Sequence, residues 1–480
     1  MDEIEEKLRD IMILLPLLVL LPFLAAAVSF LAGKRLSGYV SVAFSSAVLM
    51  LTLLAVYLAA QGGLNSMAFS ASYIPSLNLS FHLQLTQLSL ILVVMTSIVF
   101  FAASLAGVYF IKASRLYNII FLAAEGASLG VFLSANLLFL YVFWEVAEIM
   151  MFFIIFIFGG YDRKYAAIKF IIYSLLSSML LLVAILVLYT AATPHTFNIG
   201  ALAGLASQIP QQVQLLVVVL LTVAFMIKIP VFPFHTWLPD AHTEAPTTGS
   251  MILAGVLLKF GGYGLLLMFL MLPLSHTYTL YMALLFGFSA VYSALVTLKQ
   301  TNMKRLIAYT SITDMGIISV GIAASNLFGT SGALYGMMGH ALAISLLFLI
   351  AGIVDEAYGT LEIGNLKRII AQFPALAYLF IAGVFAALGL PLTAGFIGDL
   401  LIFIGSFKAF GLLGVAPLAG LFIAGAALFW TVERVFLGAS EPTVPYGSVG
   451  RGIILQGAVL LAASIALGVL PFLLLGISRL

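Results

Sequence analysis

The sequence contains no cysteine among its 480 residues. This excludes disulfides, Cys-based zinc sites and Cys-ligated iron–sulfur clusters from the chain. Serine, histidine and aspartate residues are present, but they are not arranged in the nucleophile-elbow motif of a hydrolase. No glycine-rich phosphate loop follows a strand, because the sequence shows no clear strands. We therefore expect no catalytic site, metal site or cofactor in this chain.

Charge is almost as scarce as cysteine. Charged residues make up 8% of the chain, against about a quarter in a typical soluble domain. Hydrophobic residues make up 63%, and the mean hydropathy is +1.21. The net charge of +2 gives no reason to expect a nucleic-acid partner. These values predict an integral membrane protein, and the absence of a long linker indicates one polytopic domain over 1–480.

Apolar runs long enough to cross a membrane recur along the chain. A spanning helix needs about 20 apolar residues, and that length predicts about fourteen helices in an all-α fold. The acidic, mixed start MDEIEEKLRD is unlike a cleavable signal peptide, so the first run is expected to be retained. The runs are 11–32, 38–60, 86–110, 117–135, 136–158, 164–192, 211–236, 244–272, 277–298, 304–324, 331–354, 374–412, 415–436 and 452–477.

Loops that contain Lys and Arg alternate along the chain with loops that lack both residues. Cytoplasmic loops are expected to be rich in Lys and Arg, and this predicts that both termini lie on the outer side of the cell membrane. The outward loops at 61–85, 193–210 and 325–330 contain neither residue. The inward loops hold Lys34, Arg35, Lys112, Arg115, Arg163, Lys164, Lys299, Lys304, Arg305, Lys367, Arg368, Arg434 and Arg451.

Two proline- and glycine-rich segments interrupt the seventh and twelfth runs, at 228–233 and 389–395. Proline removes a backbone donor, and irregular backbone at membrane depth survives only where protein or water covers it. Paired broken helices are typical of two related halves with a transport site between them. We predict one repeat over helices four to eight, about 115–272, and a second over helices nine to thirteen, about 277–436. The alternative is two ordinary proline kinks.

A few ionisable residues lie near the middle of the apolar runs. Such groups cost several kcal/mol in the bilayer and mark ion pathways by default. A buried lysine loses affinity for its proton and a nearby carboxylate restores it, so pairs of this kind suit proton or cation movement. The alternatives are that Glu125 and Glu148 only join helices, that His340 bonds a carbonyl, and that His235 only stabilises the first break. The full set is Glu125, Glu145, Glu148, Lys228, His235, Lys259, Asp314, His340 and Asp399.

Several segments resemble the proton-conducting antiporter-like family. This family includes antiporter-like subunits of respiratory complex I, the A and D subunits of Mrp cation/proton antiporters, and matching subunits of membrane-bound hydrogenases. The most specific match is KIPVFPFHTWLPDAHTEAPTTGS at 228–250. The others are YVFWE at 141–145, LAGVLLKFGGYG at 253–264, KRLIAYT at 304–310, HALAISLLFLIAG at 340–352 and GLPLTAGFIGD at 389–399.

The resemblance implies about fourteen helices in two inverted five-helix repeats, each with a broken helix. It implies that Glu145 pairs with Lys228, and that Lys259 and His340 carry charge in the eighth and eleventh helices. The charged residue of the broken twelfth helix, Lys or Glu in relatives, is Asp399 here. Ion translocation is therefore assigned to Glu145, Lys228, Lys259, His340 and Asp399.

The chain departs from the family pattern in its second half. Asp314 replaces a histidine, Asn302 replaces an acid, and Ile344 stands where some relatives carry a second lysine. The second half is thus more acidic than usual, and carboxylates are also good ligands for hard cations. Among family members, the resemblance is greatest to the complex I subunit M type and the Mrp D type. The transported ion is either H⁺ alone or H⁺ exchanged for Na⁺.

The resemblance implies a non-catalytic, ion-translocating membrane subunit of a complex I-related respiratory complex. Examples are a membrane-bound hydrogenase or a ferredoxin- or NADH-linked oxidoreductase. Its partners are expected to be other membrane subunits and hydrophilic redox subunits, which hold any iron–sulfur, flavin or nickel centres. The alternatives are a subunit of a stand-alone Mrp-type Na⁺/H⁺ antiporter, a structural scaffold, and a quinone-site subunit.

Overall fold

The computed structural model describes residues 2–34, 36–62, 64, 67–111, 114–438, 441, 443–445 and 450–478. Arg35 and Lys112, two of the basic residues expected in inward loops, lie outside the described residues, as does the side chain of Arg451. Which side of the membrane faces the cytoplasm remains a prediction.

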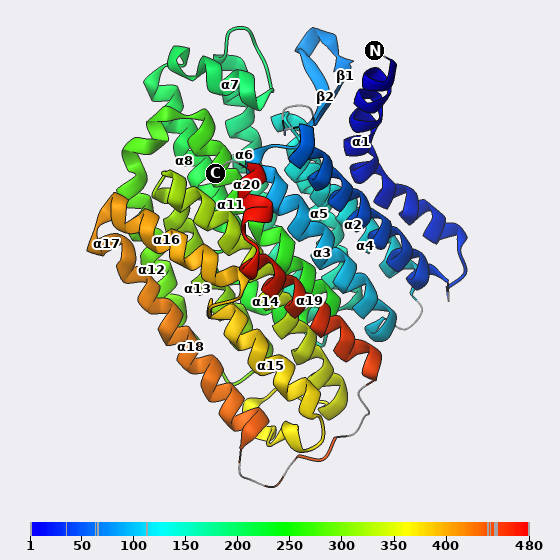
Figure 1. Cartoon of the computed structure of the whole chain (residues 1–480). Coiled ribbons are helices and arrows are strands. Elements are labelled where there is room, and N and C mark those ends of the chain that lie inside the picture. The colour runs from blue at the N-terminus through cyan, green and yellow to red at the C-terminus, as the bar shows by residue number, and fades with distance from the viewer. Residues whose placement is uncertain are drawn as a thin grey trace.

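The described chain is a bundle of apolar helices (Figure 1). Thirteen helical segments of the described residues are long and apolar enough to cross a membrane, and the pair α15 and α16 provides a fourteenth, broken span. This confirms the predicted polytopic helical fold. The helices are α1 (Asp2–Leu31), α2 (Ser37–Gly62), α3 (Gln87–Phe110), α4 (Arg115–Leu133), α5 (Leu137–Phe158), α6 (Arg163–Ala191), α7 (Ile199–Leu205), α8 (Gln211–Lys228), α9 (Trp237–Glu244), α10 (Thr247–Ile252), α11 (Leu258–Met271), α12 (Thr279–Thr297), α13 (Met303–Ala323), α14 (Leu327–Tyr358), α15 (Pro374–Ala387), α16 (Ala394–Phe410), α17 (Leu412–Val415), α18 (Ala419–Thr431), α19 (Arg451–Val469) and α20 (Phe472–Ser478).

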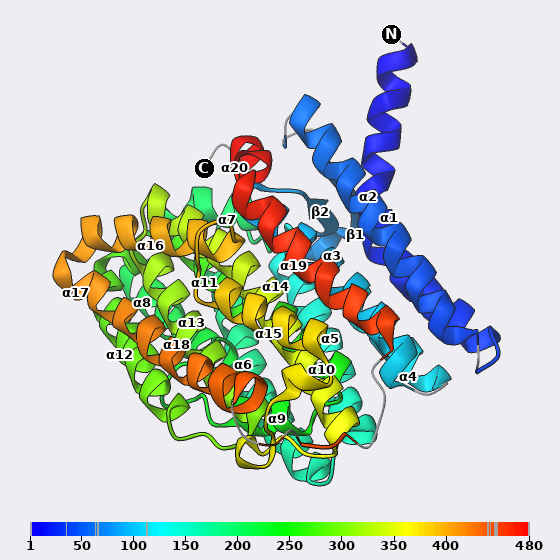
Figure 2. The ribbon, with the colours of Figure 1, turned by 60° about the horizontal axis from the view of Figure 1, so that its bottom comes forward.

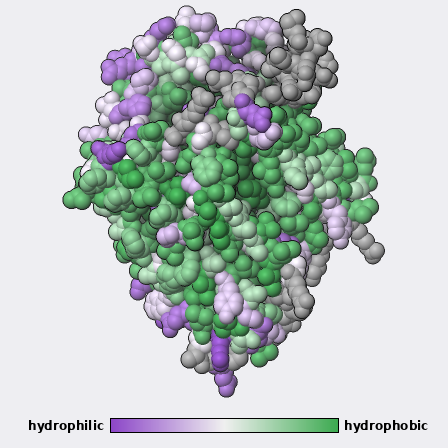
Figure 3. Space-filling view, in the orientation of Figure 1, coloured by the Kyte–Doolittle hydropathy of each residue, from purple (hydrophilic) through white to green (hydrophobic). Residues whose placement is uncertain are grey.

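The helices pack in more than one layer around α14, which contacts α3, α10, α13, α15, α16 and α19. Helices α1 and α2 lie at one edge, and α12, α17 and α18 lie at the other, in both ribbon views (Figures 1 and 2). The apolar part of α14 is entirely buried in the bundle. A band of hydrophobic side chains covers the middle of the surface, and hydrophilic residues gather at its two ends (Figure 3). This is the surface that a bilayer requires.

Asparagine side chains begin several of the helices. Asn136 Oδ1 accepts hydrogen bonds from the backbone N–H groups of Leu138 and Phe139, at 3.0 and 3.4 Å. Asn302 caps α13 and Asn326 caps α14 in the same manner. Each cap satisfies a backbone donor at the start of a helix, an arrangement that typically contributes about 1 kcal/mol. The caps therefore fix where each span starts.

Both predicted interruptions are present. Helix α8 ends at Lys228, and irregular backbone at 229–236 connects it to the short helix α9. The Ile227 carbonyl accepts a hydrogen bond from Trp237 Nε1 at 3.0 Å, and Ser289 Oγ accepts one from the Phe232 N–H at 2.9 Å. These side chains replace the hydrogen bonds that the prolines disrupt, which is the condition for a broken helix at membrane depth.

The second interruption separates α15 from α16. Gly389 lies in it with φ +58°, a left-handed conformation that glycine adopts without steric cost. Thr393 Oγ1 donates to the Leu390 carbonyl at 2.7 Å. Helices α14 and α16 pack closely beside this break, because a Cβ atom at Gly339 would lie 2.5 Å from the backbone of Gly395. The limits of the two repeats, about 115–272 and 277–436, stay a prediction.

A β-hairpin connects α2 to α3, and here the expectation of no strands was wrong. Strands β1 (Ala68–Ile74) and β2 (Leu79–Gln84) pair antiparallel, and Asn78 occupies the left-handed region at the turn with φ 50°. The signal was present in the alternating polar and apolar residues of LSFHLQ. The hairpin lies at the same end of the molecule as α7 (Figure 1).

Candidate functional site

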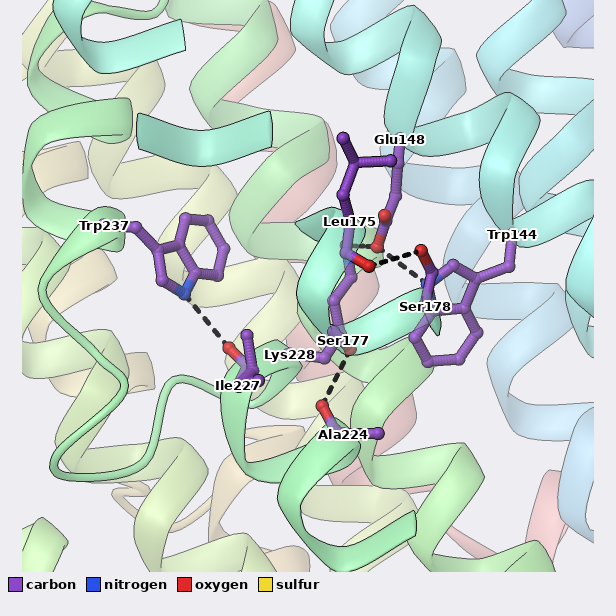
Figure 4. A network of polar contacts seen from close by, with 9 residues as sticks. All are labelled: Trp144, Glu148, Leu175, Ser177, Ser178, Ala224, Ile227, Lys228 and Trp237. Atoms are coloured by element: carbon purple, nitrogen blue, oxygen red, sulfur yellow. Dashed lines mark hydrogen bonds and ion pairs between the residues drawn. The ribbon is translucent and has the colours of Figure 1, made fainter. Parts of the chain in front are cut away.

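A buried ion pair lies where α8 ends at the first break. Lys228 Nζ and Glu148 Oε1 are 2.5 Å apart, and each side chain is 1% exposed. Trp144 Nε1 donates to the same carboxylate oxygen at 2.7 Å (Figure 4). Helix α6 is tied to α8 beside this pair, because Ser177 Oγ donates to the Ala224 carbonyl at 2.8 Å. Removal of one partner would leave the other charge buried and uncompensated, which is strongly destabilising.

The pairing differs from the one expected, which joined Lys228 to Glu145. Glu148 is the partner, and Glu145 lies one helical turn away on α5, half-buried. Glu145 Oε1 has no hydrogen-bond partner within the described part of the chain, and its carboxylate interacts electrostatically with both Glu148 and Lys228. One lysine therefore faces two carboxylates on the same helix face.

The second buried lysine is Lys259, which is fully inaccessible to solvent. Its Nζ donates to the Ala254 carbonyl at 2.6 Å and lies 2.6 Å from His340 Nδ1. Ala254 belongs to a π-helical stretch, η4 (Leu253–Leu257), directly before α11. The wider turn of a π-helix presents this carbonyl to the lysine, and such bulges are frequent at functional sites.

His340 continues the contact from α14 to α13. Its Nε2 atom lies 2.8 Å from Ser311 Oγ, and the side chain is 4% exposed. The alternative in which this histidine only bonds a carbonyl is not what the structure contains. Lys259, His340 and Ser311 thus form a hydrogen-bonded series across three helices.

Two carboxylates lie beyond Ser311, on α13 and α16. Asp314 lies one turn beyond Ser311 on α13, and its Oδ1 is buried without a hydrogen-bond partner among the described residues. It interacts electrostatically with Asp399 and with Lys259. Asp399 is half-buried on α16, and its Oδ2 lies directly against Gly389 at the second break.

Two other predicted residues lie apart from this series. Glu125, on α4, accepts a hydrogen bond from Ser45 Oγ of α2 at 2.7 Å, and its Oε1 has no partner in the described chain. His235 lies in the first break, where its ring is 5.4 Å from that of Tyr292 and 5.9 Å from that of Phe232. Glu125 therefore joins helices, and His235 lines the break.

Sequence reasoning missed His242 and misplaced Lys304. His242, on α9, is fully buried and stacks on Phe348 with ring centroids 4.5 Å apart. Neither ring nitrogen has a hydrogen-bond partner in the described region, and Lys259 and Lys304 act on it electrostatically. Lys304 was expected in an inward loop, but it is 5% exposed and donates to the Ala245 carbonyl at 3.1 Å.

A surface salt-bridge network holds α9 in place. Asp240 forms salt bridges with Lys169 Nζ of α6 at 2.7 Å and with Arg305 Nη2 of α13 at 3.1 Å.

The only sequence signal for His242 was its position seven residues after His235 in the segment at 228–250. The burial of His242 and of Lys304 depends on how α9 packs against its neighbours. Helix α9 has only eight residues, too few for a sequence periodicity to predict that packing.

Comparisons with known proteins match most of this chain. Residues 134–424 match the family described as NADH:quinone oxidoreductase/Mrp antiporter, TM. NADH-quinone oxidoreductase subunit M of Rickettsia typhi is 32% identical over 477 residues, 98% of this chain and 96% of that protein. The same subunit of Rickettsia bellii is 37% identical over 370 residues, 76% of this chain and 74% of that protein.

Solved structures have the same fold. A chain of respiratory complex I from Thermus thermophilus aligns with a TM-score of 0.88 at 25% identity, covering 97% of this chain and 99% of that one. A chain of the Mrp complex from Dietzia sp. aligns with a TM-score of 0.86 at 20% identity, over 97% of this chain and 96% of that one. The second likeness concerns the fold alone.

Proposed function

The chain belongs to the NADH:quinone oxidoreductase/Mrp antiporter transmembrane family, and on that premise we propose that it is the ion-translocating membrane subunit of a complex I-related redox complex. One observation carries the proposal: the buried series Lys259–His340–Ser311, with Glu148–Lys228 on one side of it and Asp314 and Asp399 on the other. Ionisable groups buried at membrane depth are costly, and they persist where they move charge.

The first half of the proposed path is a lysine that faces two carboxylates. Lys228 pairs with Glu148, while Glu145 lies one turn away and interacts with the same lysine. Movement of the lysine from one carboxylate toward the other changes the electrostatic environment of the next lysine, Lys259. A pair that opens and closes in this way controls which groups hold a proton.

The middle of the path relays a proton between helices. Lys259 donates to His340, and His340 contacts Ser311, so a proton that enters at one end of this series displaces one at the other. Histidine is suited to this step because its two ring nitrogens exchange donor and acceptor roles.

The far end of the path is acidic. Asp314 and Asp399 are electrostatically coupled carboxylates beside the second break. They serve as proton acceptors, and they also favour exchange of H⁺ with a hard cation such as Na⁺. In this proposal the chain holds no redox centre, and partner subunits hold any iron–sulfur, flavin or nickel centres.

An alternative is a subunit of a stand-alone Mrp-type Na⁺/H⁺ antiporter, which the acidic second half favours. Purification of the tagged full chain in mild detergent, followed by mass spectrometry of the co-purifying proteins, distinguishes the two. Hydrophilic, cysteine-rich partners with flavin or nickel support the redox complex. A set of only small hydrophobic partners contradicts it and supports the antiporter.

A further inference from the structure

A pocket of about 260 Å³ opens where α12 and α18 end, at the opposite end of the molecule from the hairpin (Figure 1). The last residue of α12 and the loop after it, 297–301, form one wall. Residues of α18 and of the π-helical stretch η9 (Val432–Leu437) form another. Lys299 and Arg434 lie in segments expected to face inward, so we expect the pocket to open toward the inner leaflet of the membrane.

The pocket contains positive charge that no residue in the described chain neutralises. Lys299 and Arg434 line it, both are exposed, and neither side chain forms a salt bridge or a hydrogen bond with any residue that the structure describes. No acidic residue is among its described lining residues. Glu362 and Glu433, the acids nearest in sequence to its walls, are exposed and lie outside it. An anion that enters the pocket therefore meets two cations without a competing partner.

An aromatic ring orients one of these cations. The Arg434 Cζ atom lies 4.0 Å from the centre of the Trp430 ring, and Trp430 is itself 46% exposed. A guanidinium group that stacks on a ring keeps its N–H groups free at its edge, where they match the oxygens of a phosphate group. Tryptophan is enriched where the bilayer meets water, at the depth of the phospholipid headgroups. The pocket therefore combines a phosphate-binding side chain with a residue typical of headgroup depth.

Exposed apolar side chains on both helices lead from the pocket toward the middle of the membrane. On α12, Phe288, Leu295 and Leu298 are exposed, and their spacing of seven and three residues places them on one helix face. On α18, Phe422 and Phe429 are exposed and also lie seven residues apart. The two helices pack against each other, and Leu298 is itself a lining residue of the pocket. This surface suits acyl chains, and the charged pocket at its end suits an anionic headgroup.

We propose that this pocket binds the phosphate group of an anionic phospholipid from the inner leaflet, with Lys299 and Arg434 as its ligands and the acyl chains along α12 and α18. Basic pockets between transmembrane helices on the cytoplasmic side bind such headgroups. A zwitterionic lipid fits less well, because its ammonium group finds no carboxylate among the described lining residues. The inference goes beyond the proposed function and does not depend on which ion the chain moves.

The tryptophans provide a reporter for this site. The chain has three, and Trp144 and Trp237 are 0% and 1% exposed, so only Trp430 is accessible to lipid. Phospholipids with brominated acyl chains quench the fluorescence of a tryptophan that they contact. The purified full chain is placed in phosphatidylcholine vesicles, and brominated phosphatidylglycerol or brominated phosphatidylcholine is titrated in. Trp430→Phe gives the background emission of the two buried tryptophans.

We expect brominated phosphatidylglycerol to quench Trp430 at a mole fraction at least about fivefold lower than brominated phosphatidylcholine does. Lys299→Gln and Arg434→Gln should each lower this preference, and the double variant should abolish it. Lys164→Gln is the matched control, because Lys164 is also exposed and expected to face inward but does not line the pocket. The preference should also fall as salt is added, because screening weakens attraction between exposed charges.

Four results would overturn the proposal. Equal quenching by the two lipids, or an undiminished preference in the double variant, shows that the two cations do not select the headgroup. Relief of quenching by free inorganic phosphate at millimolar concentration shows that the pocket binds a soluble anion instead. Quenching in the isolated chain but not in the purified native complex shows that a partner subunit covers this surface. In every variant, unchanged emission from the buried Trp144 and Trp237 shows that the chain is folded.

Discussion

Lys259 and His340 lie 81 residues apart in the sequence, yet Nζ and Nδ1 are 2.6 Å apart in the buried centre of the bundle. An ammonium group only donates, so Nδ1 accepts whenever Lys259 is charged. Nε2 then carries the ring proton and donates to Ser311 Oγ, 2.8 Å away. A charged Lys259 therefore selects the tautomer of the histidine in which Nε2 carries the proton, and the Ser311 hydroxyl accepts that proton as a hydrogen bond.

Removal of the serine hydroxyl should weaken this relay. Ser311→Ala leaves His340 Nε2 without its partner in a buried site, a loss of about 1 to 3 kcal/mol. We expect the rate of ion translocation to fall several-fold. Ser319→Ala is the control on the same helix, because Ser319 Oγ only donates to the Met315 carbonyl within α13. Equal rates in both variants would show that Ser311 has no part in the relay.

The identity of the Lys228 partner is testable by stability. Glu148→Gln removes the carboxylate that lies 2.5 Å from Lys228, and breaking a buried pair in this way costs about 3 to 5 kcal/mol. Glu145→Gln, one turn away, should cost less than about 1 kcal/mol, because Glu145 is half-buried and not the ion-pair partner. Thermal denaturation of the purified proteins measures both changes.

A double variant sharpens this comparison. Lys228→Met combined with Glu148→Leu should be more stable than either single variant, because no unpaired charge stays buried. A larger loss for Glu145→Gln than for Glu148→Gln would favour the Glu145–Lys228 pairing that the family resemblance implied.

The position of Asp399 depends on the second break. A methyl group at Gly389 would collide with Asp399 Oδ2, so Gly389→Ala should displace this carboxylate and reduce translocation several-fold. Gly411→Ala is the control, because Gly411 has a similar φ of +60° but no atom within 4 Å of a new Cβ. Both variants place alanine at a positive φ, and Gly411, with ψ −139°, lies close to a region that is nearly restricted to glycine. A greater loss of transport in Gly389→Ala than in Gly411→Ala therefore reports the displacement of Asp399 rather than backbone strain. Comparable transport in both variants would contradict the role of Asp399.

Sequence patterns predicted the helices and both breaks because these features follow from local chemistry. Length and hydropathy define a membrane span, and Pro230, Pro233 and Gly389 mark irregular backbone directly. The buried lysines at 228 and 259 were identifiable for the same reason, since few residues of their kind occur in the middle of apolar runs.

The sequence did not reveal contacts that depend on helix rotation and packing. Glu145 and Glu148 share one face of α5, and only the approach of α8 decides which of them meets Lys228. The burial of His242 and Lys304 likewise results from the way α9 packs against α13. The hairpin at 68–84 was missed because its short strands contain several serines and few β-branched residues.

The most direct test of the account is ion translocation by the purified native complex in proteoliposomes, with wild-type chain or with Lys259→Ala. Transport is driven by the electron donor of the complex, or by an imposed Na⁺ gradient if the partners include no redox subunit. Lys164→Ala, at an exposed position near the start of α6, is the control. We expect Lys259→Ala to lose at least about tenfold of the translocation rate while Lys164→Ala retains it, because a buried charged group that moves ions cannot be replaced by a neutral one. Translocation by Lys259→Ala at the wild-type rate would contradict the account.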